Sequence, residues 1–235
     1  NDLRLNKYLK PLVNIGAKHD MKVNNETVLT GEVYFPDYSE QKKIVDFLTI
    51  LDERIRQQRN LVEALKKYKR GAVRHLLSPK SCPLKNASWT TTKMGKLGSF
   101  VKGAPLSKAD ISEDGTLFIL YGELYTTYNE VVTSVKRQTQ AQVDELFLSR
   151  VGDVVIPTSG ETPEEISTAS CVMLPGVILA GDLNIFRGDK VDGRIMSYLL
   201  NHVVNAKIAR IAQGKSVVHI QASELCKLTL TYPDK

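Results

Sequence analysis

The segment from Ser39 to Leu77 constrains the fold of this chain most, because it is long, contains no proline and has a single glycine, Gly71. Apolar residues recur along it in alternating steps of four and three, with one polar exception. The positions of this stripe, called the seam below, are Ile44, Leu48, Leu51, Ile55, Gln58, Val62 and Leu65. A heptad pattern held for about three heptads is typical of a helix that packs lengthwise on another helix. At 1.5 Å per residue the helix would be roughly 60 Å long, so we expect a strut or spacer.

Signals at the start of the segment predict where the helix begins. Pro36 ends the preceding extended run, Glu32–Phe35. Ser39 is placed to cap the first free amides, and Glu40 sits in the first turn, where an acidic residue suits the helix dipole.

Two features of the segment each allow two interpretations. Gln58 either fixes the register of a coiled coil at a cost in stability or marks a local water-exposed break. The second feature is charge: the chain carries a net charge of +6, and residues 39–78 hold ten Lys and Arg against five Asp and Glu. The basic end of the helix is either a solvated face that suits the helix dipole or a surface for a polyanion such as DNA. Its cations are Lys66, Lys67, Lys69, Arg70 and Arg74.

The rest of the composition favours a cytoplasmic protein. No run of about 18 apolar residues is present, so we expect no membrane partner, and the N-terminus resembles no signal peptide. Cys82, Cys171 and Cys226 are far apart, odd in number and form no CxxC pair, which predicts reduced thiols. Because the first residue is Asn rather than Met, we expect a fragment or a processed form.

Beyond the helix, the pattern changes to short strands and turns. Residues 78–88 contain two prolines and are expected to be a linker. The predicted strands are 117–121, 153–156, 177–180 and 228–232, and the predicted helices are 139–148 and 194–212. The expected fold class is therefore α+β, with a mixed α/β domain over residues 89–235 and one long coiled-coil-forming helix over residues 39–77.

A weak internal repeat links the two ends of the chain. Lys7-Tyr8-Leu9 is followed later by Val33-Tyr34-Phe35-Pro36-Asp37, and Ser197-Tyr198-Leu199 is followed by Leu230-Thr231-Tyr232-Pro233-Asp234. In the first copy the Pro-Asp pair leads into the long helix. We therefore interpret residues 1–38 as the C-terminal tail of a first domain and residues 89–235 as a complete second copy.

Two sets of motifs recur in a known family. The first is Pro36-x-x-x-Glu40-Gln41-x-x-Ile44, then Leu51-Asp52-x-x-Ile55, then Leu65-Lys66-x-x-Lys69-x-Gly71. The second is Gly95-Lys-Leu-Gly98, Lys102-Gly103, Lys108, Leu120-Tyr121-Gly122, Gly152-Asp-Val-Val-Ile156 and Ser159-Gly160. Together these residues resemble the DNA-specificity (S) subunits of type I restriction-modification systems, over nearly the whole chain.

The resemblance implies a non-catalytic subunit whose target-recognition domain reads one half of a bipartite double-stranded DNA site, with a helix as the spacer. It implies methyltransferase (modification) subunits that use S-adenosylmethionine, and restriction subunits that use ATP and Mg, as partners. No cofactor is then expected in this chain. Without a first domain body or a second helix, the chain looks like the second half of such a subunit or a half-length variant. The seam has no partner helix in this chain, so we expect it either to pair antiparallel with another copy in a homodimer or to make the chain aggregation-prone.

Candidate DNA contacts are polar and basic residues in turns beside the predicted strands. They are Lys102, Lys108, Tyr125, Thr126, Thr127, Thr158, Ser159, Thr162, Gln213, Lys215, Ser216 and His219. Lys and hydroxyl groups suit phosphates, while Gln can read base edges. Tyr121 and Tyr128 belong to the same region, and Tyr121 suits a core equally well. Because residues 79–235 are nearly neutral, we expect binding to need both domains and partner subunits.

Motifs for chemistry are absent from the sequence. It has no GxGxxG, Walker A or Gly-x-Ser-x-Gly motif, and no Asn/Asp-Pro-Pro-Tyr/Phe motif like that of adenine methyltransferases. The four histidines show no metal-ligand spacing, and Thr158-Ser-Gly-Glu-Thr162 comes with no Ser/His/Asp set. The alternative to DNA recognition is a coiled-coil interaction or scaffold protein whose mixed domain binds protein.

Overall fold

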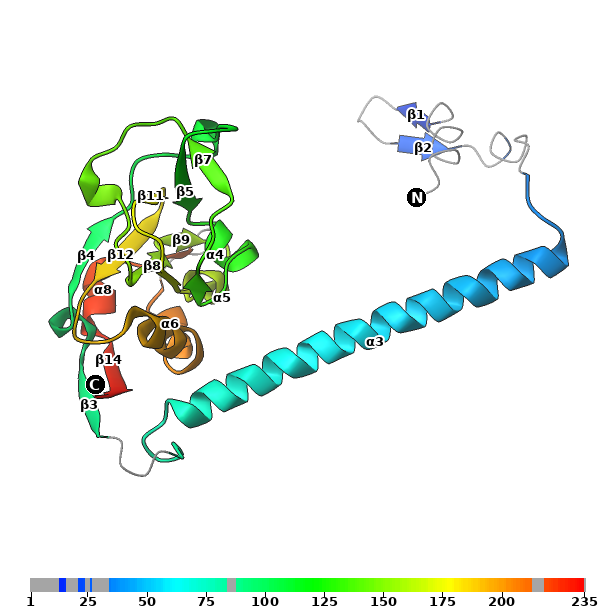
Figure 1. Cartoon of the computed structure of the whole chain (residues 1–235). Helices are drawn as coiled ribbons and strands as arrows, with labels where there is room; N and C mark the ends of the chain where they lie inside the picture. Colours follow the sequence, from blue (N-terminus) through cyan, green and yellow to red (C-terminus); the bar gives the residue numbers. More distant parts are fainter. Residues whose placement is uncertain are drawn as a thin grey trace. The chain divides into compact units, whose positions relative to one another are not determined.

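The computed structural model describes residues 13–15, 21–23, 26, 34–83, 88–212 and 218–234 of the chain (Figure 1). The chain divides into two compact units, Asn1–Glu63 and Ala64–Lys235. The long helix α3 (Tyr38–Leu76) contains this boundary, so its last turns belong to the second unit. The predicted division into tail, helix, linker and recognition domain stays a prediction.

The first unit contains a short antiparallel pair and the larger part of α3. In the pair, β1 (Val13–Ile15) runs beside β2 (Met21–Val23). The predicted extended run is described only at Tyr34 and Phe35, where the backbone is irregular and the side chains are exposed.

The length of α3, 39 residues, agrees with the sequence prediction. The residue that caps its N-terminus, however, is not the predicted Ser39. The Oδ1 atom of Asp37 accepts hydrogen bonds from the Glu40 amide at 2.9 Å and from the Ser39 hydroxyl at 2.8 Å. The bond from the Glu40 amide is the main reason why the pKa of Asp37 lies below its ordinary value. Ser39 is therefore inside the first turn, and the prediction that it caps the helix was wrong. A carboxylate competes better than a hydroxyl for these amides because its hydrogen bonds are charge-assisted.

The second unit is built around a five-stranded sheet in the order β4-β12-β8-β10-β6. These strands are β4 (Ser99–Lys102), β6 (Val131–Val132), β8 (Asp153–Pro157), β10 (Ser170–Val172) and β12 (Leu183–Arg187). Neighbouring strands run antiparallel, except that β10 and β6 run parallel.

A three-stranded sheet in the order β11-β5-β7 packs beside it. Its strands are β5 (Thr116–Leu120), β7 (Arg137–Thr139) and β11 (Ile178–Ala180). Because β5 and β11 are parallel, both end at the same edge of the sheet. Two short antiparallel pairs join β3 (Trp89–Lys93) with β14 (Thr229–Pro233) and β9 (Ser159–Gly160) with β13 (Val218–His219).

Short helices connect and cover the strands. The α-helices are α4 (Glu123–Thr126), α5 (Pro163–Ile166), α6 (Gly193–His202), α7 (Asn205–Ile211) and α8 (Ala222–Lys227). The 3₁₀ turns are η2 (Met94–Lys96), η3 (Lys108–Asp110) and η4 (Glu145–Phe147).

The run Val154-Val155-Ile156 in β8 explains how the layers stack. Successive side chains of a strand point to opposite faces of the sheet. Val154 and Ile156 belong to a hydrophobic cluster with residues of α6, whereas Val155 belongs to a second cluster with residues of β5 and β11. The five-stranded sheet is therefore covered by helices on one face and by the three-stranded sheet on the other. Burial on both faces accounts for the uninterrupted apolar run.

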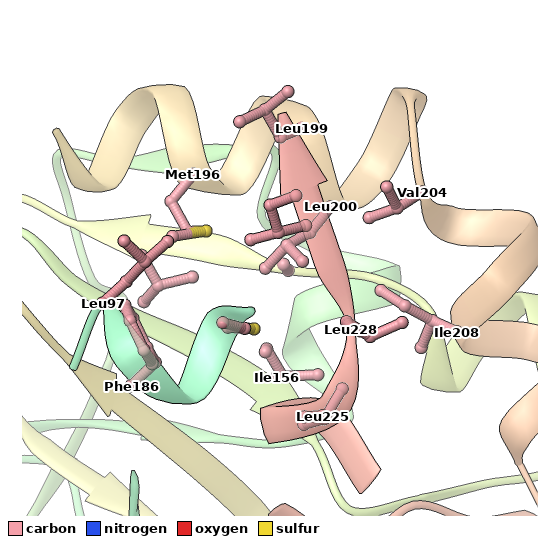
Figure 2. Close-up of a cluster of buried hydrophobic side chains, with 14 of the residues drawn as sticks. Leu97, Ile156, Phe186, Met196, Leu199, Leu200, Val204, Ile208, Leu225 and Leu228 are labelled. Atoms are coloured by element: carbon pink, nitrogen blue, oxygen red, sulfur yellow. The ribbon is translucent and has the colours of Figure 1, made fainter. Parts of the chain in front are cut away.

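Figure 2 shows the cluster on the helical face of the sheet. Met196 and Leu200 of α6 point toward Leu97, Ile156 and Leu225, and all five side chains are buried. Burying one such side chain contributes about 1.5–3 kcal/mol, so this cluster is the main core of the unit.

The four predicted strands are confirmed as β5, β8, β11 and β14, each to within one residue at its ends. The helix predicted over residues 139–148 was wrong. Thr139 ends β7, and only η4 is helical in that stretch. Val143 and Phe147 instead pack on the outer face of the three-stranded sheet, so tertiary contacts override the local pattern.

The helix predicted over residues 194–212 is two helices, α6 and α7. The amides of Val203 and Val204 both donate to the Leu199 carbonyl, which ends α6, and α7 starts again at Asn205. Two β-branched residues followed by Asn favour helix poorly, which explains the break at this place.

Candidate nucleic-acid interface

A cleft of about 670 Å³ lies in the second unit, where the parallel strands β5 and β11 end. Tyr121 and Gly122 follow β5, Gly181 and Asp182 follow β11, and all four line the cleft. Gly181 has a φ of 77°, a conformation that glycine adopts without strain. The carboxyl ends of parallel strands are a common place for ligand sites, because the chain turns away there and leaves a crevice.

A partly buried ion pair connects two elements that line this cleft. The Glu123 side chain, only 6% exposed at the start of α4, accepts a hydrogen bond from Arg137 Nε of β7 at 2.8 Å. Its other oxygen accepts from the Leu120 amide at 3.1 Å. A buried carboxylate is costly unless it is paired and hydrogen-bonded, and these bonds meet that need. The pair holds the end of β5, α4 and β7 together beneath the cleft.

A capped turn presents a cation to the cleft. The Ser107 amide donates to Asp110 Oδ2 at 2.7 Å, and the Ala109 amide donates to Ser107 Oγ at 3.2 Å. These bonds form a capping box around η3, which begins with the exposed Lys108. The cleft therefore has a lysine on a fixed backbone at its edge.

Tyr125 contributes a hydroxyl from α4. Burial is the main cause that raises its pKa above the ordinary value, and the neighbouring Tyr121, Glu165 and Glu161 raise it further. The hydroxyl therefore stays protonated at neutral pH and can donate a hydrogen bond. Figure 1 shows α4 and α5 at the same side of the domain, and Glu165 belongs to α5.

The pairing of β9 with β13 brings two other predicted positions together. Ser159 lies opposite His219 in this pair. The Ser159 hydroxyl also donates to Asp182 Oδ2 at 2.7 Å, and Asp182 lines the cleft. Thr158, the preceding residue, donates its amide to the Asp182 carbonyl at 2.7 Å. Asp182 thus connects Thr158 and Ser159 to the cleft, and Ser159 in turn pairs with His219.

Two of the remaining described candidates hydrogen-bond to the local backbone. Thr126 Oγ1 donates to the Gly122 carbonyl, and Thr162 Oγ1 caps α5 by accepting from the Glu165 amide. Thr127 follows the last residue of α4, and Lys102 ends β4 opposite Asn184. Of these residues, Thr126 lines the cleft.

Three candidates, Gln213, Lys215 and Ser216, lie outside the described residues. Four polar or charged residues that line the cleft are absent from the predicted candidates: Ser107, Glu123, Arg137 and Asp182. Asp182 could have been found, because it follows Gly181 directly after a predicted strand. Arg137 has no sequence signal, since its partner comes from another element. The assignment of the candidate residues to DNA contact stays a prediction.

The seam of α3 is a separate exposed surface. Its apolar side chains range from 40% exposed at Leu51 to 57% at Leu65, and Gln58 is also exposed. No residue of α3 is buried in this structure. An apolar stripe of this length, interrupted only by Gln58, is typical of an interaction surface rather than a solvated one.

The described ranges also bear on metal binding, membrane insertion and thiol chemistry. No group of three or more His, Cys, Asp and Glu side chains there could hold a metal ion. The helices in these ranges include none that is both long and apolar enough to cross a membrane. All three cysteines are free thiols, and burial is the main cause that raises the pKa of Cys171, to about 12.

Comparison with known proteins gives structural similarity only. No protein-family model matches the sequence, and no curated protein matches it. The S subunit of the type I restriction-modification system from M. genitalium is 17% identical, with a TM-score of 0.47 over 66% of this chain. The HsdS subunit from Thermoanaerobacter tengcongensis is 17% identical, with a TM-score of 0.48 over 97% of this chain.

A third solved chain gives the similarity that carries the argument. It comes from a structure describing complex assembly and conformational transition of the type I R-M system, and it is 18% identical with a TM-score of 0.53 over 98% of this chain. This chain spans 37% of the length of the M. genitalium chain and 56% of each of the other two. The predicted fold class, a mixed α/β domain plus one long helix, is confirmed, and the chain shares its fold with a chain of a type I R-M system.

Proposed function

We propose that this chain is a non-catalytic DNA-specificity subunit of a type I restriction-modification system. The observation that carries the proposal is the fold shared over 98% of the chain with a chain of such a system. The helix motifs of the sequence and the exposed seam support it independently of that comparison. In this proposal the second unit reads one half of a bipartite DNA site, and α3 is the spacer between the halves.

The cleft supports DNA reading through the chemistry of its edge. Lys108 would contact a phosphate, which supplies affinity without sequence information. Asp182 offers acceptor oxygens and Tyr125 a protonated hydroxyl, and groups of this kind can distinguish base edges in the major groove. His219, which is exposed opposite the buried Ser159 in the β9–β13 pair, would add a further polar group to this surface.

The proposal includes two kinds of partner: a second copy of the chain, and subunits that carry out the chemical reactions. The seam would pair antiparallel with the α3 helix of a second copy, giving two reading domains and one helical spacer. Modification subunits would supply S-adenosylmethionine chemistry, and restriction subunits would supply ATP- and Mg-dependent cleavage. The complex would act in the cytoplasm.

Two measurements test this function. Methylome sequencing of cells that carry the chain with modification subunits should reveal one bipartite methylated sequence. The complex should then bind a duplex with that sequence at least 10³-fold more tightly than a scrambled duplex, with affinity that falls as salt rises.

The scrambled duplex and the modification subunits without this chain are the controls. Binding that depends on neither salt nor sequence would overturn the proposal and favour a scaffold that binds protein. Unchanged methylation after deletion of the chain would overturn it as well.

A further inference from the structure

The last turns of α3 pack on the mixed α/β domain, which belongs to the same unit, through one stripe of the helix. Val73 packs against the main hydrophobic cluster, and Leu77, directly after the helix, is a buried member of it. Lys69 lies four residues before Val73, so Lys69, Val73 and Leu77 share one helix face. Lys69 also lies four residues after Leu65, where the seam would continue. The recognition domain therefore occupies the helix face that a partner helix would use upstream.

One carboxylate connects this stripe to the domain. Glu130, next to β6, has a side chain that is only 10% exposed. Its Oε2 atom accepts from Lys69 Nζ at 2.6 Å, and its Oε1 atom lies 2.5 Å from His202 Nε2, at the end of α6. A nearly buried carboxylate needs such partners, because its desolvation is costly when it is unpaired.

Further contacts surround this pair. Arg74 Nε donates to the carbonyl of His202 at 2.6 Å. This carbonyl belongs to the last turn of α6, where backbone acceptors have no partner within the helix. The Lys69 ammonium lies 5.8 Å from the centroid of the Tyr198 ring, and that ring stacks with the His202 ring at 6.0 Å. Two helices and a strand thus meet at one ionic cluster.

We propose that Glu130 is a positioning residue that locks the last turns of α3 onto the recognition domain. This junction, rather than the linker after the helix, then fixes the direction in which the helix leaves the domain. A continuous helix carries the direction of its last turns along its length, so the junction would also set the distance between the two DNA half-sites. The statement about half-sites rests on the proposed function, whereas the lock itself does not.

Hydrogen exchange of the full chain tests the lock directly. In Glu130→Gln, amides of residues 64–76 should exchange at least tenfold faster than in the parent protein, while those of β8 and β12 keep their protection. Lys67→Met is the matched control, because it removes an exposed lysine from the same turn of α3 as Lys69. If Glu130→Gln fails to fold, Lys69→Met carries the test, since the Lys69 side chain is 46% exposed. Unchanged exchange over residues 64–76 in the folded variant would overturn the proposal.

A DNA measurement tests the consequence for spacing. The complex with modification subunits is titrated with duplexes whose half-sites are separated by the native spacing or by one base pair more or fewer. In Glu130→Gln, the ratio of the affinities for the native and the altered spacing should fall at least threefold. The base preference within each half-site should stay the same. A spacing profile identical to that of the parent would refute the positioning role. If the parent protein binds no duplex specifically, the proposed function fails, and the exchange result still decides the lock.

Discussion

The ionisation of Glu130 contributes to folding stability in a defined pH window. Burial alone would raise its pKa, but the hydrogen bonds from His202 and Lys69 outweigh burial and lower the pKa to about 2. In the unfolded chain the carboxyl titrates near 4.5. The folded state therefore takes up the proton less readily than the unfolded state. The ionised Glu130 carboxylate therefore stabilises the folded state fully above about pH 5, and this stabilisation is lost as the pH falls from 4.5 toward 2.

The lowered pKa of Glu130 predicts how the stability of a variant without this carboxylate depends on pH. The difference in the free energy of unfolding between the parent and Glu130→Gln should shrink as the pH falls from 5 toward 3. The full shift corresponds to roughly 3 kcal/mol. Denaturant titrations at several pH values measure it, with Lys67→Met as the control that removes an exposed charge from the same end of α3. A difference that stays constant down to pH 3 would contradict the role of this carboxylate.

Lys108 has a different kind of effect, because it is exposed at the edge of the cleft. Lys108→Ala should weaken DNA binding by the complex about equally for all sequences. It should also reduce the slope of log affinity against log salt by about one unit, as expected for one lost phosphate contact. Lys207→Ala, an exposed lysine of α7 outside the cleft, is the control. A changed base preference with an unaltered salt slope would rule out a phosphate contact.

Single residues also show where sequence reasoning stops. The basic end of α3 was interpreted either as a solvated face or as a surface for a polyanion. In the structure Lys69 and Arg74 instead contact the domain of the same chain. Neither contact has a sequence signal, because the partners, Glu130 and His202, are far away in the sequence and belong to other elements. The Glu123–Arg137 pair was missed for the same reason.

At the scale of the element, α3 was predictable because its pattern is local. The heptad repeat, the absence of proline and the acidic first turn all lie within one segment, so no tertiary contact was needed to find it. The segment 139–148 was mispredicted for the opposite reason. Its fold is decided by contact with the three-stranded sheet, which no local pattern encodes.

The seam predicts how the chain assembles. Leu51→Glu places a charge in the middle of the apolar stripe, so it should shift a self-associated species to the monomer in light scattering across micromolar concentrations. Ile50→Glu is the matched control, because Ile50 is exposed on α3 but lies outside the seam. If the parent chain is a clean monomer over the whole concentration range, pairing through the seam is wrong.

At the scale of the whole molecule, the proposed function predicts that the length of α3 sets the separation of the two DNA half-sites. Inserting seven residues between Arg59 and Asn60 keeps the heptad repeat and lengthens the helix by about 10 Å. That is roughly three base pairs of DNA at 3.4 Å each. Methylome sequencing should then show unchanged half-sites at a larger separation. An unchanged separation would mean that α3 is not the spacer.

The architecture of the second unit could be predicted only in outline. Strands such as β8 are visible in the sequence because they are buried on both faces and therefore read as apolar runs. The cleft was not predictable, since it depends on β5 and β11 lying parallel and adjacent although they are distant in the sequence. Of the residues that line the cleft, the sequence predicted Lys108, Tyr125 and Thr126. It did not predict the Glu123–Arg137 ion pair that holds the walls of the cleft together.

The boundary between the two units, at Ala64 within α3, bears on how such chains can be recombined. A crossover between related genes upstream of the codon for Ala64 would transfer the domain together with Lys69, Val73 and Arg74. A crossover in the codons for residues 78–83 would join the domain to a foreign helix end, leaving Glu130 without its own lysine. Functional chimeras should therefore have their joints inside the helix, at least one turn before Lys69.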